Sequence, residues 1–187
     1  MLIAQSKRKT NIVEYLLYMY QIEDIIRSFQ FNLSTIDATI VQKHEQPEEV
    51  KLQINEWYAA LIKKMQQNKL ERSGHLPELR NTVAELQNLH DQLLTTYFDK
   101  KYIDLYDSAQ PVLKELAVKT VGQGLVNEID VAVHGVYGYL VLRLKQKNIG
   151  EETQSAITKI TSFLAHLAVQ YHKKEAGKLE IPTEQRN

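Results

Sequence analysis

Cysteine is absent from the 187 residues of this sequence. The chain therefore has no disulfide framework, no thiol nucleophile and no cysteine ligand for a metal. This composition fits a reducing compartment. Glycine and proline are also scarce, at 7 and 4 residues. Because these two residues punctuate the turns between short elements, their scarcity favours long helices over many short strands.

Neither sign of charge is in excess, since 23 basic residues balance 23 acidic ones. A domain that grips phosphate backbones generally carries a basic excess, so nucleic acid is an unfavoured partner. No apolar run approaches the roughly 20 residues of a membrane span, and we expect no membrane association. We do not expect the basic residues 7–9 to begin a signal peptide, because Glu14 and Glu23 interrupt the apolar run that follows. The expected location is the cytoplasm.

Several motifs of catalysis are missing as well. The sequence has no Glu-x-x-His pair of the kind that builds di-iron sites in helical bundles, and no His-Glu-x-x-His. It has no phosphate-binding glycine loop, no Gly-x-Ser-x-Gly elbow, and not the arginine-to-histidine spacing of the helical nuclease domains known as HEPN. We therefore expect neither a cofactor nor a metal site. The sequence favours a protein that is not an enzyme, although missing motifs do not exclude catalysis in general.

The apolar stretch 129–144 organises the rest of the chain. Between residues 131 and 144 only His134 and Arg143 are strongly polar, and apolar positions cover almost the whole helical wheel. Such a helix is usually buried by its neighbours. The sequence therefore predicts an all-α fold, a single-domain bundle of about six to seven helices around a buried central helix. We expect residues 1–176 to form this domain and residues 177–187 to be a loosely ordered polar tail.

Apolar spacings of three and four residues place the other helices. Thr10 or Asn11 can cap the first, after a short polar start, and Ser34 with Asp37 resembles a capping box. Pro111 cannot continue a helix without the loss of a hydrogen bond, so we expect a break there. The predicted helices are approximately 12–31, 47–71, 77–97, 129–148 and 151–176, with shorter helical segments at 34–43, 99–110 and 111–119.

Asp130, His134 and Tyr137 are the best candidates for chemistry. Spacings of four and three residues place them on one strip of the central helix. The carboxylate could orient the imidazole as a general base, or the two could supply metal ligands. Alternatively, the strip hydrogen-bonds to neighbouring helices inside the core, which is the interpretation that we favour. If the strip lines a ligand pocket, we expect Glu23 to face it from the first helix.

Other polar residues have simpler explanations. Glu23 and Arg27 are four residues apart and are expected to pair in a structural network. His90 lies on an apolar stripe and is predicted to be a hydrogen-bonded core residue. His166 lies opposite an apolar stripe and is predicted to be exposed to solvent.

Gly135 and Gly138 interrupt the central helix. Each destabilises a helix by about 0.5–1 kcal/mol relative to alanine, so some other interaction should offset that loss. We expect close packing of another helix at both positions, with room for a small ligand as the alternative.

Three parts of the chain are similar to the signatures of a known family. These are the opening 9–24 (KTNIVEYLLYMYQIED), the centre 127–144 around NEID and YGYL, and the end 163–175. Together they resemble an uncharacterised bacterial family of domains of unknown function, over essentially the whole chain. The resemblance implies a small all-helical cytoplasmic protein, and it supplies no activity, substrate or catalytic residue.

The sequence favours a non-enzymatic helical module that works through association, either as a homo-oligomer or with a protein partner. The support is the balanced charge, the missing motifs and the fact that packing explains each polar cluster. An exposed contiguous apolar patch would favour this hypothesis. The alternative is a small-molecule-binding or hydrolase-like bundle with a pocket between the first and central helices. Its lining would be Asp130, His134, Tyr137 and Glu23.

Overall fold

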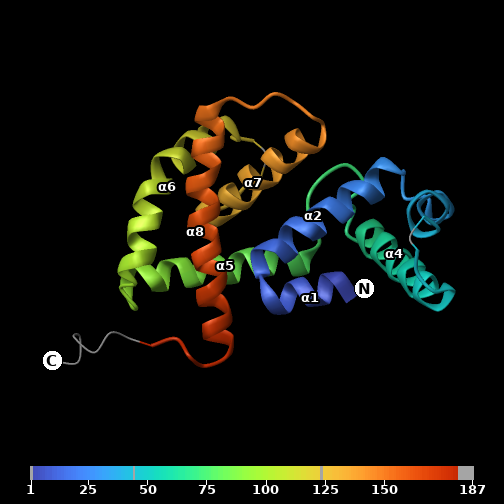
Figure 1. Cartoon of the computed structure of the whole chain (residues 1–187), viewed down its shortest axis with the longest axis horizontal. Coiled ribbons are helices and arrows are strands. Elements are labelled where there is room, and N and C mark those ends of the chain that lie inside the picture. Colours follow the sequence, from blue (N-terminus) through green and yellow to red (C-terminus); the bar gives the residue numbers. More distant parts are fainter. Residues whose placement is uncertain (1, 44, 123, 181–187) are drawn as a thin grey trace. The chain divides into compact units, whose positions relative to one another are not determined.

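The computed structural model describes residues 2–43, 45–122 and 124–180, and Figure 1 shows its helices. Over these residues it contains eight α-helices and one π-helical turn and no strand, which confirms the all-α class. None of the helices described is both long enough and apolar enough to cross a membrane. The sequence predicts about six to seven helices because it assigns the first residues of the chain to a short polar segment. In the structure these residues form the helix α1 (Leu2–Thr10).

The chain divides into two compact units. The first comprises Met1–Arg8 with Glu14–Asn81, and the second comprises Lys9–Val13 with Thr82–Asn187. The single domain over residues 1–176 stays a prediction. Of the tail predicted for residues 177–187, residues 181–187 lie outside the part that the structure describes.

The first unit holds most of α1 and α2 (Ile12–Ser28), then α3 (Leu33–Ile36), the π-helical turn η1 (Asp37–Val41) and α4 (Glu48–Gln67). Lys7 forms an ion pair with Glu14 at 2.8 Å, and this pair ties α1 to α2. The apolar stripe that helical spacing predicts for α4 runs from Val50 to Met65 and is buried except at Val50 and Trp57, which are half-buried. Its buried residues are Ile54, Tyr58, Leu61, Ile62 and Met65.

The predicted capping box at Ser34 is wrong. The side chain of Asn32 caps α3, accepting a hydrogen bond from the Thr35 N–H at 3.0 Å. Asn is as good an N-cap as Ser. The chain reaches it through Gln30 and Phe31, both at positive φ (52° and 62°), which fixes the start of α3 before Ser34.

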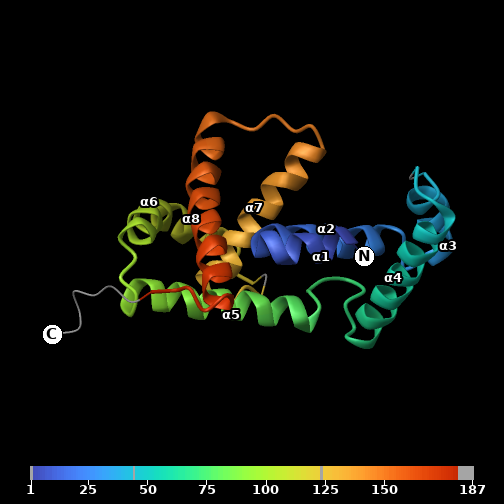
Figure 2. The same cartoon turned by 60° about the horizontal axis from the view of Figure 1, so that its bottom comes forward.

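The second unit is built from most of α5 (Pro77–Thr95) together with α6 (Lys100–Lys119), α7 (Glu128–Leu144) and α8 (Glu151–Glu175). The helix α8 contacts both α6 and α7, and α6 also contacts α7. Figures 1 and 2 show this group of three helices. Asp99 caps α6 and Asn127 caps α7, each by accepting a backbone N–H from the first turn.

The break predicted at Pro111 is wrong, because α6 continues through it. Proline removes one backbone donor, which leaves the Asp107 carbonyl without its helical partner. Both Pro111 and Asp107 are exposed, so water can bind that carbonyl. Ala109 and Leu113 on the other face are buried, and this packing keeps the segment helical. Figure 1 shows α6 as a curved helix.

The burial predicted for the central helix α7 is found in its first half. Ile129, Ala132 and Val133 are fully buried there. In the second half, Leu142 and Leu144 are 42% and 69% exposed. Figures 1 and 2 show that α7 and α8 diverge towards the connection between them. The apolar pattern of α7 therefore extends beyond the point where its packing partner leaves it.

The two glycines of α7 differ. A Cβ at Gly135 would lie 2.8 Å from Leu116 Cδ1 of α6, which confirms the close packing predicted there. A Cβ at Gly138 would meet nothing within 4 Å, so close packing is wrong at that position.

We expect Gly138→Ala to stabilise the protein by about 0.5–1 kcal/mol, because alanine lowers the conformational entropy of the unfolded chain. Its methyl group also contacts no neighbouring atom in the folded helix. Gly135→Ala should gain less, since its methyl group must displace the end of the Leu116 side chain. Urea unfolding followed by far-UV circular dichroism measures both variants. A Gly138→Ala protein less stable than the original would contradict this expectation.

Candidate functional site

Glu23, one of the predicted site residues, is enclosed in the first unit with no exposed side-chain surface. Its Oε1 accepts the Leu76 N–H at 2.8 Å, and its Oε2 lies 2.5 Å from His75 Nδ1. The His75 ring stacks on Tyr20 with the ring centroids 3.6 Å apart. Glu23 thus fastens the connection between α4 and α5 to α2.

The predicted pairing of Glu23 with Arg27 is wrong. Arg27 instead donates to Asp24 at 2.8 Å and to the carbonyl oxygens of Leu70 and Gly74. Glu23 and Arg27, on consecutive turns of α2, therefore bind the same connection. Glu23 binds His75 and Leu76. Arg27 binds two backbone carbonyl oxygens. The partners of Glu23 and Arg27 thus lie in the connection between α4 and α5, and the spacing of residues along α2 cannot predict them.

Asp130 and His134 meet on α7 in the second unit. His134 Nδ1 lies 2.9 Å from the Asp130 carbonyl oxygen and 3.1 Å from its Oδ1. Burial alone would lower the pKa of His134, but the hydrogen bonds to Asp130 outweigh it and raise this pKa. Asp130 is itself positioned by the Val126 N–H, which donates to its Oδ2 at 3.2 Å. Tyr137 is half-buried one turn further along.

The four predicted site residues are thus divided between the units. Glu23 belongs to the first, and Asp130, His134 and Tyr137 belong to the second. A pocket lined by all four stays a prediction. Among the residues that the structure describes, no three His, Asp or Glu side chains are grouped so that they could hold a metal ion.

His90 is the centre of a buried polar network in the second unit and is 2% exposed, as predicted for a core histidine. Its Nδ1 lies 2.8 Å from the Tyr102 hydroxyl, and its Nε2 lies 3.5 Å from the Glu128 carboxylate. Edge-to-face contacts with Tyr102, Tyr106 and Phe163 surround the ring. Burial lowers the pKa of His90 and raises that of Tyr102, so a neutral imidazole faces a protonated phenol.

A second polar cluster lies at the start of α6. One oxygen of Asp99 accepts the Tyr102 N–H at 3.0 Å. The other lies 2.9 Å from His166 Nε2 and 2.6 Å from Gln170 Nε2. Burial alone would raise the pKa of Asp99, but the hydrogen bonds from His166, Tyr102 and Gln170 outweigh it and lower this pKa.

The prediction that His166 is exposed to solvent is wrong, because its side chain is 14% exposed. It lies off the apolar stripe of α8, yet the start of α6 covers it and supplies the Asp99 carboxylate. A polar position on one helix was therefore buried by a residue 67 positions away in the sequence.

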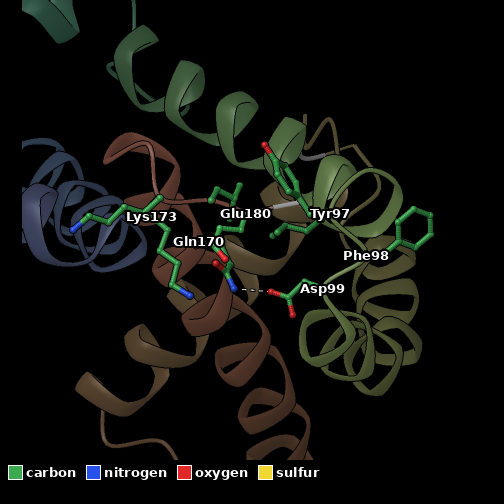
Figure 3. Close-up of a pocket in the computed structure, with 9 residues that line it drawn as sticks. Tyr97, Phe98, Asp99, Gln170, Lys173 and Glu180 are labelled. Atoms are coloured by element: carbon green, nitrogen blue, oxygen red, sulfur yellow. Dashed lines mark hydrogen bonds between the residues drawn. The ribbon is translucent and has the colours of Figure 1, made fainter. Parts of the chain in front are cut away.

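A pocket of about 400 Å³ adjoins this cluster in the second unit. Leu93 and Gln170, both buried, contribute to its lining, and Asp99 lies at its edge. Figure 3 shows the Gln170 amide nitrogen turned towards Asp99. The remaining lining residues are Tyr97, Phe98, Lys173, Lys178, Leu179 and Glu180.

A hollow of about 540 Å³, lined in part by Tyr139, Arg143 and Lys147, adjoins the end of α7. The exposed half of α7 is therefore a second candidate site, and it is mainly an exposed surface. We call it the α7 end surface, and it consists of Tyr139, Leu140, Leu142, Arg143, Leu144, Lys145 and Lys147. Residues 142–148 are all exposed. The Arg143 guanidinium lies over the Tyr139 ring at 6.0 Å. Two carboxylates, Glu151 and Glu152, follow in the first turn of α8.

Sequence reasoning did not single out Asp99 or Gln170. The signal for Asp99 was available, because Asp directly before a helical segment is a strong N-cap pattern. Its contacts with His166 and Gln170 had no such signal. Lys173 lies in the last turn of α8, where a positive charge is favourable, and that position alone does not indicate a binding site.

The fold and these clusters define an all-helical protein with hydrogen-bonded polar clusters between its helices. A family model described as a domain of unknown function (DUF4924) matches residues 1–178, and the chain belongs to that family. This confirms the resemblance to a family of domains of unknown function. No curated protein and no solved structure matches the chain.

Proposed function

We propose that this protein is a self-associating helical module in which the α7 end surface of one copy contacts that of a second copy. The observation that carries the proposal is the exposure of Leu142 and Leu144, at 42% and 69%. Leu142 and Leu144 lie on different sides of the helix end, each beside charged residues in the sequence. Exposed apolar residues bordered by charge are typical of association surfaces. Tyr139 and Leu140, both half-exposed, extend the apolar area.

The charges around this surface favour a second copy of the chain as the partner. Arg143, Lys145 and Lys147 end α7, and Glu151 and Glu152 begin α8. None of these five charged groups forms an ion pair with another residue that the structure describes. In a two-fold dimer each copy presents the same patch, so the cations of one copy can face the carboxylates of the other. An acidic partner would leave the two carboxylates unmatched.

Sedimentation equilibrium of the purified chain tests this proposal. We expect a dimer that Leu144→Glu weakens at least roughly tenfold, because the variant puts a charge in place of the most exposed apolar residue of the α7 end surface. Leu52→Glu is the matched control, since Leu52 is a similarly exposed leucine (60%) on α4. A chain that stays monomeric well above micromolar concentration, or a dimer that is equally sensitive to both variants, would contradict the proposal.

Reversed charges provide a sharper test of the partner. We expect Lys145→Glu/Lys147→Glu to weaken the dimer, and Glu151→Lys/Glu152→Lys to do the same, because each places like charges opposite one another. An equimolar mixture of the two variants should associate again, because every contact then joins opposite charges. If the mixture stays monomeric, the two charged groups do not face each other.

A further inference from the structure

We propose that the pocket beside Asp99 binds a small zwitterion of the amino-acid type with an apolar side chain. The site shares no residue with the α7 end surface, and the proposal does not depend on self-association. It rests on three features of the lining: two neighbouring lysines, a buried amide with an available oxygen, and an apolar wall.

The two lysines are brought together by the end of α8. Gly177 adopts a left-handed conformation (φ 66°), and the Lys178 N–H then donates to the Lys173 carbonyl at 2.8 Å. This turn is the usual way in which a helix closes its last carbonyl groups. It brings the backbones of these two residues together, and both residues contribute to the lining of the pocket. Neither lysine forms an ion pair with another residue in the described part of the chain. Two ammonium groups are thus available for a carboxylate.

The buried amide supplies an acceptor. Gln170 is 6% exposed and lines the pocket. A carboxylate can only accept hydrogen bonds, so Gln170 must direct its amide nitrogen to Asp99 and its oxygen away from it. That oxygen accepts no hydrogen bond from the side chains and backbone that the structure describes. Glu180 adds a carboxylate to the same lining, and together they suit a ligand ammonium group.

The mixture of charges selects the ligand class. A ligand with only a negative charge would be attracted by the lysines but repelled by Glu180 and Asp99. A ligand with only a positive charge would be repelled by Lys173 and Lys178. A ligand with both charges satisfies both sets of groups. Leu93, Tyr97 and Leu179 offer apolar surface for a side chain, and the volume of about 400 Å³ lies within the usual range for ligand pockets.

Isothermal titration calorimetry with L-phenylalanine and L-leucine tests the proposal. We expect at least one of them to bind, and we expect 3-phenylpropanoate and phenethylamine, which each lack one of the two charges, to bind at least tenfold more weakly than L-phenylalanine. Inorganic phosphate should not bind. Phosphate that binds as tightly as the amino acids would show an anion site only, and no binding of either amino acid at millimolar concentration would overturn the proposal.

A pair of variants assigns the binding to this pocket. Lys173→Met keeps most of the side-chain length and removes the charge, and it should weaken binding at least tenfold. Lys159→Met is the matched control, an exposed lysine on α8 that is not part of the pocket lining, and it should leave binding unchanged. Equal affinity of the two variants would place the ligand elsewhere. Leu144→Glu should bind the amino acid as the original chain does, which separates this result from self-association.

Discussion

Replacement of Glu23 by alanine is expected to destabilise the first unit by about 2–4 kcal/mol, because two groups lose a hydrogen-bond partner and each such loss costs about 1–3 kcal/mol in a buried site. The Leu76 N–H and His75 Nδ1 would both lose their partner in an enclosed site. The Leu76 N–H is buried and cannot recover its lost hydrogen bond from water, which makes this unsatisfied group costly, whereas the His75 side chain is 17% exposed. The connection between α4 and α5 would then be held to α2 mainly through Arg27.

Tryptophan fluorescence can follow this effect in the first unit alone. The chain has a single tryptophan, Trp57, and it lies in α4. Glu14→Ala is the matched control, because Glu14 is 54% exposed in its ion pair with Lys7 and such pairs are worth at most about 1 kcal/mol. Urea unfolding that gives Glu23→Ala and Glu14→Ala the same midpoint would show that the Glu23 contacts contribute little.

The parts of the fold that the sequence predicts well are those that depend on near neighbours. The stripe of α4 and the start of α5 at Pro77 follow from spacings and residue types within a few positions. The same is true of the pair Asp130 and His134, which are four residues apart on one helix. Local periodicity determines such features before any tertiary contact is made.

The remaining features depend on residues far apart in the chain. Glu23 and His75 are separated by 52 positions, and Asp99 and His166 by 67. Helical spacing cannot show that a connection will fold back onto a charged residue, so it paired Glu23 with Arg27. It also cannot show where a packing partner ends, and the exposed half of α7 was therefore expected to be buried. Pro111 was misjudged because the burial of Ala109 and Leu113 outweighed one lost hydrogen bond.

The second large effect is expected at His90. His90→Leu should destabilise the protein by about 2–3 kcal/mol, because the fully buried Tyr102 hydroxyl loses its partner 2.8 Å away. Addition of Tyr102→Phe removes that unsatisfied hydroxyl. The double variant should therefore be more stable than His90→Leu alone. A double-mutant cycle from urea unfolding measures the coupling, and energies that simply add would show that the two groups do not interact.

The pH dependence of stability gives an independent measure of the same network. Burial lowers the pKa of His90 below its usual value of 6.5, so the unfolded chain takes up a proton at a higher pH than the folded chain does. The stability that neutral His90 contributes is fully present above pH 6.5. It is lost as the pH falls from 6.5 through the lowered pKa of His90. His134 has the opposite sign, since its raised pKa adds stability that is lost as the pH rises through that value. His90→Leu should therefore remove the part of the loss that begins at pH 6.5. It should keep the contributions of His134 and of Asp99, whose lowered pKa reduces stability only at more acidic pH. A variant whose stability falls with acid as steeply as that of the original chain would show that the His90 proton is not coupled to folding.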